Sequence, residues 1–187
     1  GVTKSINGVG TRVLRIEEIG ENCDFSSPAA QNRLLDFAHS FQILALSCRK
    51  VAEATVAFAD NEIIHSWIAQ LELFRDQKNA GLSTPLSIEF IASYAPYQVL
   101  RVVYGELYSQ FLWGYPLLSK FDVLGLTNAL YASYLDSMIH ALEHSDAPGF
   151  ALQLSDFMGH QLRSIAKLLI DEGISQAKTI LDYLDGE

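Results

Sequence analysis

The chain has 187 residues, of which 49% are hydrophobic and 19% charged, and its formal net charge is −9. This length suits one domain, and the low charged fraction indicates that much of the chain is buried in its own core or against a partner. The only close basic pairs are Arg49 with Lys50 and, at helical spacing, Arg163 with Lys167. We therefore expect neither nucleic acid nor an anionic membrane surface as a partner.

The sequence contains no membrane-spanning pattern, because no apolar run approaches the ~20 residues that a spanning helix needs. The longest run, 99–113, is interrupted by Arg101 and Glu106. No stretch has the pattern of a signal peptide, and we expect a cytoplasmic protein. Cys23 and Cys48 are too few for a disulfide scaffold. Cys48 is expected to be a buried free thiol, which favours a reducing compartment.

Residues 1–26 differ in composition from the rest of the chain, with several glycines and few large aromatic side chains. This predicts an N-terminal arm, in which residues 11–19 fit either one helical turn or a short strand. Ser27 and Pro28 then combine an N-cap residue with proline at the first helical position. We therefore expect a single helical domain over residues 27–187.

The first expected helix is long, because apolar side chains recur three and four residues apart from Leu34 to Phe58. A helix over residues 28–59 would extend about 48 Å. This seam consists of Leu34, Phe37, Phe41, Leu44, Cys48, Val51, Thr55 and Phe58. Since the seam is longer than one compact domain easily covers, we expect it to support helix-mediated self-association.

Six further helices are expected after the long one. They are predicted from 60 or 61 to about 78, from 85 to 94, from 96 to about 113, from 122 or 127 to 144, from about 147 to 172 and from 174 to 184. The helix at 96–113 is apolar on nearly all sides, which predicts that it is the central buried helix. Six to seven helices with short connections and no convincing strand predict an all-α bundle.

A row of tyrosines around one arginine is the candidate ligand-binding site. Tyr94, Tyr97, Arg101, Tyr104 and Tyr108 follow one another at roughly helical spacing beside an apolar stripe. An apolar pocket with a few convergent polar groups is how small-ligand sites are built, so the row would suit a small, largely apolar ligand. The more common arrangement has tyrosines at the core boundary with their hydroxyls in water and the arginine extended to solvent.

His140, Glu143 and His144 form the string H-x-x-E-H, the short signature of inverted zinc peptidases. Residues four apart share a helix face, so the histidines could hold one metal ion with Glu143 as a base. However, such short strings occur by chance, no partner motif follows, and the pair continues a polar row through Ser133 and Ser137. The string therefore indicates two solvated histidines near a helix C-terminus, and we expect no metal.

The sequence contains no nucleophile elbow, no phosphate-binding loop and no C-x-x-C motif, and it indicates no cofactor. We therefore expect a non-catalytic regulatory or protein-interaction module that self-associates. Two alternatives stay open. One is a sensor or carrier domain with its ligand at the tyrosine–arginine row, and the other is a metal-dependent hydrolase that uses His140 and His144.

Overall fold

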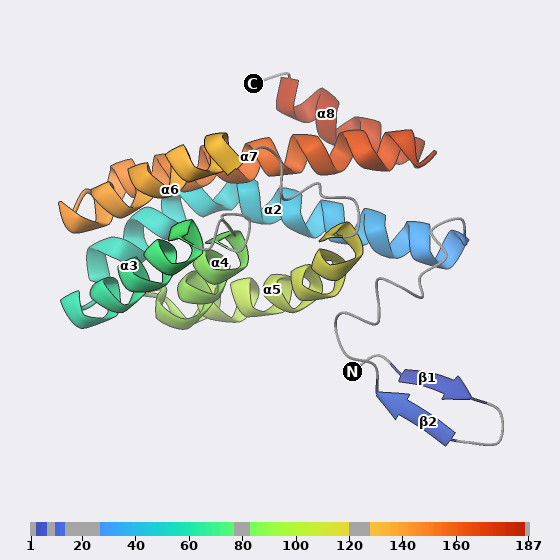
Figure 1. Ribbon diagram of the computed structural model, residues 1–187, viewed down its shortest axis with the longest axis horizontal. Coiled ribbons are helices and arrows are strands. Elements are labelled where there is room, and N and C mark those ends of the chain that lie inside the picture. Colours follow the sequence, from blue (N-terminus) through green and yellow to red (C-terminus); the bar gives the residue numbers. More distant parts are fainter. Residues whose placement is uncertain (1–2, 7–9, 14–26, 77–82, 120–127, 186–187) are drawn as a thin grey trace.

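The structure is a computed structural model that describes residues 3–6, 10–13, 27–76, 83–119 and 128–185 (Figure 1). The helices within these ranges are α2 (Pro28–Phe58), α3 (Asn61–Asp76), α4 (Ser83–Tyr94), α5 (Gln98–Ser119), α6 (Asn128–Glu143), α7 (Ala147–Asp171) and α8 (Lys178–Asp185), and a 3-10 helix, η2 (Ser175–Ala177), precedes α8. These elements confirm the expected all-α bundle.

The N-terminal arm contributes one short antiparallel hairpin. Strand β1 (Thr3–Ile6) pairs with β2 (Gly10–Val13), and Thr3 lies opposite Val13. Strand β2 covers the beginning of the patch for which the sequence left helix and strand open. Because a two-stranded hairpin alone buries little apolar surface, the helices determine the fold class. Cys23 lies outside the described residues.

Helix α2 begins where the sequence predicts. Ser27 is its N-cap, and its hydroxyl oxygen accepts a hydrogen bond of 3.2 Å from the backbone N–H of Ala30. Pro28 occupies the first turn, where a missing backbone N–H costs nothing. The helix continues for 31 residues, which corresponds to about 46 Å at the helical rise.

The apolar seam of α2 is covered within the same chain. Seven of its residues are buried, namely Leu34, Phe37, Phe41, Leu44, Cys48, Val51 and Thr55, and only Phe58 at the end of the helix is exposed. The helix packs along α7 on one side and along α5 on another, and these neighbours fill the seam. The seam is therefore part of the core and offers no free face for association, contrary to our expectation.

The buried central helix expected at 96–113 is α7 instead. Helix α7 packs against α2, α6 and α8, and 11 of its residues are buried (Figure 1). In α5, by contrast, Val99, Val102 and Val103 are 66%, 62% and 45% exposed. Helices α2 and α4 cover one side of α5. The valines lie on a side that these helices leave uncovered, so α5 has apolar side chains on its exposed side as well. None of the described helices is long and apolar enough to cross a bilayer.

Three aromatic side chains join α3, α4 and α7 in the core. The ring of Trp67 stacks on Phe90 with centroids 3.7 Å apart and meets Phe150 edge-on at 4.6 Å. All three side chains are buried. Such contacts add to the large apolar area that each ring removes from water, so this cluster links α3 and α4 to each other and α3 to α7.

Helix boundaries agree with the sequence pattern at α7 and depart from it in α5. Asp146 caps α7, and its carboxylate accepts a hydrogen bond of 2.9 Å from the backbone N–H of Gly149. Helix α5, expected to end at about Trp113, continues to Ser119 through Pro116. A proline inside a helix removes one hydrogen bond, and here the rest of the backbone ladder continues past it.

Candidate functional site

The exposed members of the tyrosine–arginine row do not line a common cavity. Tyr97, directly before α5, and Arg101, in its first turn, are exposed to solvent, and so is Tyr94 at the end of α4. Tyr94 borders the pocket between α3 and α4, whose lining includes neither Tyr97 nor Arg101. The spacing of four, three and four residues keeps the row from Tyr97 to Tyr108 near one side of α5, but Tyr94 belongs to α4, so the row is divided between two helices.

The other two tyrosines of the row are tied to different helices. The hydroxyl of buried Tyr104 shares a hydrogen bond of 2.8 Å with Ser47 on α2. The hydroxyl of Tyr108 donates to Glu89 on α4 at 3.2 Å. Burial raises the pKa of Tyr104 far above its usual range, and burial together with the charge of Glu89 raises the pKa of Tyr108 to about 12. Both phenols therefore stay protonated at neutral pH and connect α5 to its neighbours.

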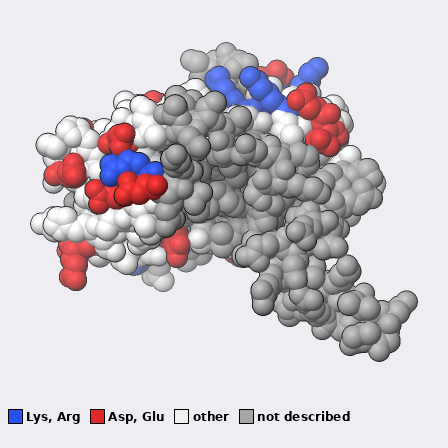
Figure 2. Space-filling model, viewed as in Figure 1, with Lys and Arg blue, Asp and Glu red and all other residues white. Residues whose placement is uncertain are grey.

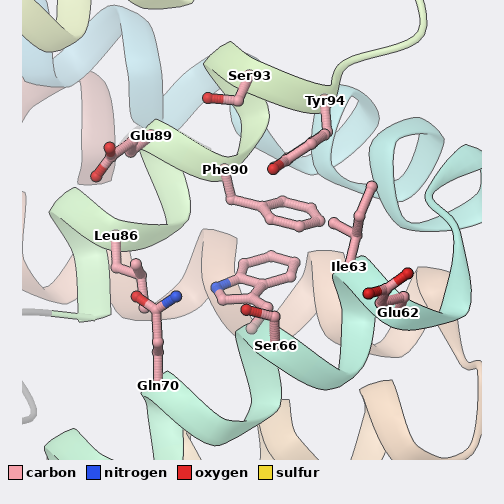
Figure 3. A pocket seen from close by; sticks show the side chains of 10 residues that line it. Glu62, Ile63, Ser66, Gln70, Leu86, Glu89, Phe90, Ser93 and Tyr94 are labelled. Carbon is pink, nitrogen blue, oxygen red and sulfur yellow. The ribbon is translucent and has the colours of Figure 1, made fainter.

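A pocket of about 370 Å³ lies between α3 and α4. Figure 3 shows Glu62 and Ser66 from α3 and Glu89 and Tyr94 from α4 around it. The two charged residues among its described lining residues are both glutamates. Trp67 also lines the pocket, and its buried indole N–H has no hydrogen-bond partner among the described residues. An acidic pocket with aromatic walls suits a cationic group and disfavours an anion.

A second groove brings together the basic residues that the sequence showed as separate pairs. This groove, of about 580 Å³, is lined by residues of α2, α6, α7 and α8. Arg49 of α2 and Arg163 of α7 both line it, and Asp156 is the one acidic residue among its described lining residues. The guanidinium of Arg163 donates to the backbone carbonyl of Leu184 at 2.6 Å, which holds it at the α8 side. Sequence spacing could not show this juxtaposition, because the two arginines are far apart in the chain.

Elsewhere the charges of the surface are mixed. On the face shown in Figure 2, the described Lys and Arg side chains form small groups beside Asp and Glu, with no continuous basic surface. Arg75 illustrates this arrangement, since it donates to Asp136 at 3.2 Å and to Asp76 at 3.4 Å. Hydrogen bonding to Asp136 raises the pKa of Arg75 further, so it remains a cation. Paired charges of this kind do not form a phosphate-binding track.

The end of α6 brings His140, Glu143 and His144 together. Their possible ligand atoms all lie within 4.8 Å of one another, and the two imidazole centroids are 4.1 Å apart. All three residues are exposed. A catalytic zinc site needs a cleft that limits water, so this arrangement does not favour the metal-dependent hydrolase. It does provide three donors of the types that bind transition metals.

Cys48 is a buried free thiol, as the sequence predicted. Burial raises its pKa to about 12, and the thiol donates a hydrogen bond of 3.3 Å to the carbonyl of Ala45. A thiol that stays protonated at neutral pH is a poor nucleophile.

Comparisons with protein-family models, with curated proteins and with solved structures found no match to this chain.

Proposed function

We propose that this chain is a non-catalytic interaction module that self-associates through the α5 face, defined as Val99, Val102 and Val103. The exposure of these three side chains is the observation that carries the proposal. Single exposed apolar residues are ordinary, but residues at positions i, i+3 and i+4 of one helix lie side by side. Packing this stripe against another molecule would remove its apolar area from water.

A second copy of the chain suits the α5 face better than a strongly charged partner. Helix α5 contains one basic residue, Arg101, and one acidic residue, Glu106, whereas the whole chain has a net charge of −9. Two copies of an acidic protein repel each other least where their surfaces are neutral. In a two-fold dimer the same patch meets itself, so α5 would pack on α5 of the other copy.

Replacing Val102 by glutamate is expected to convert the dimer to monomer. The variant would place an unpaired carboxylate from each copy at the contact, at a cost of several kcal/mol in desolvation and mutual repulsion. This cost lowers the association constant by at least about 100-fold, since each 1.4 kcal/mol of binding free energy changes that constant by a factor of ten. Sedimentation equilibrium of both proteins over a range of concentrations measures the change.

Leu73→Glu provides the matched control, because Leu73 is an exposed apolar residue of α3, outside the α5 face. This variant should associate as the unchanged protein does. The proposal fails if the unchanged protein is monomeric up to about 1 mM, a concentration that corresponds to only about −4.1 kcal/mol of association. It also fails if the two glutamate variants lose association equally.

A second candidate function is the binding of a small anionic ligand in the groove between α2, α6, α7 and α8. The presence of Arg49 and Arg163 in one cavity of an acidic chain favours it. Arginine presents a planar fork of donors that fits carboxylate and phosphate groups. Tyr134 and Tyr183 add aromatic walls, and a groove of about 580 Å³ falls in the usual range of small-molecule sites.

Inorganic phosphate is a suitable probe of this groove. At a tenfold excess over its Kd it should stabilise the protein by about 1.4 kcal/mol, measured as a rise in the thermal unfolding midpoint at constant ionic strength. Arg49→Gln should abolish the rise, whereas Arg33→Gln, an exposed position of α2 outside the groove, should retain it. An equal rise in all three proteins would identify a general salt effect and exclude the site.

A further inference from the structure

The cluster at the end of α6 lies close to the separation that a shared metal ion requires. Zinc–nitrogen bonds of about 2.0–2.1 Å place two ligands of a tetrahedral ion about 3.4 Å apart. The possible ligand atoms of His140, Glu143 and His144 already lie within 4.8 Å of one another. Small rotations of these exposed side chains are therefore enough to bring all three onto one ion. We propose that these residues form a surface site for a divalent transition metal ion.

One of the two imidazoles is already oriented for this role. Nδ1 of His144 lies 2.8 Å from the backbone carbonyl oxygen of His140. A carbonyl only accepts hydrogen bonds, so Nδ1 carries the proton and Nε2 keeps its lone pair for a metal. Metal-bound histidines usually donate their second ring nitrogen to a carbonyl or carboxylate in this way.

The local electrostatics favour a cation at this position. The cluster occupies the last turn of α6 and the residue after it, at the negative end of the helix dipole. Glu143 adds a full negative charge. Asp146, the next carboxylate along the chain, caps α7 through the backbone N–H of Gly149, which leaves Glu143 as the carboxylate ligand.

The donor set also selects the class of ion. Two imidazoles suit Zn²⁺, Cu²⁺ and Ni²⁺, whereas Mg²⁺ and Ca²⁺ prefer sites made of oxygen ligands alone. Three protein ligands leave further coordination positions for water, which the exposure of the site allows. The site is therefore suited to binding a metal, and it does not depend on self-association through α5.

Isothermal titration of the full chain with ZnCl₂, and separately with NiCl₂, tests the site. We expect one ion per chain, and an affinity that falls by at least about tenfold in His140→Ala and in His144→Ala, because each removes one of two nitrogen ligands. MgCl₂ should give no saturable binding. His39→Ala is the matched control, since His39 is an exposed histidine on a long helix with apolar residues, Leu35 and Ile43, four positions away on either side.

Circular dichroism of each variant verifies that the fold is unchanged, which we expect because all the replaced side chains are exposed. Glu143→Gln should weaken binding less than either histidine variant, since the nitrogen ligands remain. Two results would overturn the proposal. One is no saturable binding of either metal up to about 1 mM. The other is an affinity in His140→Ala and His144→Ala that equals that of the unchanged protein.

Discussion

Replacing Phe150 by alanine is expected to lower the free energy of unfolding by about 3–5 kcal/mol, the usual cost of removing a buried phenylalanine. Phe150 lies in the first turns of α7, is fully buried, and meets Trp67 edge-on at 4.6 Å. Its loss would leave a cavity beside Trp67, where the side chain of α7 contacts that of α3. Urea denaturation, monitored by circular dichroism, measures the difference between the two proteins.

Leu152→Ala is the matched control for this prediction. Leu152 lies two residues further along α7 and is exposed. Its replacement should change stability by less than about 0.5 kcal/mol, as is usual for surface positions. If the two variants were destabilised equally, the aromatic cluster of α3, α4 and α7 would contribute no more to stability than a surface position does.

Thr84→Val is expected to lower the free energy of unfolding by about 1–3 kcal/mol, although it changes the volume of the side chain very little. The hydroxyl of Thr84, on α4, donates to the amide oxygen of Gln161, on α7, and both side chains are fully buried. The amide nitrogen of Gln161 has no hydrogen-bond partner in the part of the chain that the structure describes. The substitution would therefore leave the whole amide buried and unpaired, which is the costly state of a polar group.

Adding Gln161→Leu to Thr84→Val should restore most of this loss. Replacing both partners by apolar groups removes the unpaired amide altogether, so the double variant should return to within about 1 kcal/mol of the unchanged protein. Urea denaturation of the four proteins of the cycle gives the coupling energy between the two sites. If the losses of unfolding free energy in the two single variants simply added up in the double variant, the hydrogen bond would contribute nothing to stability.

Local signals in the sequence were enough to locate most of the helices. The start of α2 depends on Ser27 and Pro28, which are adjacent in the chain and whose capping geometry needs no distant partner. The end of α5 was missed, since the helix continues past Pro116. A local stop signal predicts where a helix is weakened, and the continued ladder of hydrogen bonds decides whether it ends there.

The candidate sites depend on contacts that no local pattern contains. The tyrosine–arginine row has helical spacing, yet Tyr104 hydrogen-bonds α2, Tyr108 hydrogen-bonds α4, and Tyr97 points to solvent. The groove with Arg49 and Arg163 exists because α2 and α7 pack side by side. The histidine pair of α6 is the exception, because residues four apart on one helix are neighbours in any tertiary arrangement.

The helical class, the first cap, the apolar seam of α2 and the buried thiol of Cys48 could all be predicted, because each follows from residues close together in the chain. Which helix is central depends instead on contacts between segments far apart in the chain. Helices α5 and α7 are both rich in apolar residues, but α7 has neighbours on several sides, while the described valines of α5 face solvent. Composition sets how much apolar surface a helix has, and packing decides which part of it remains for a partner.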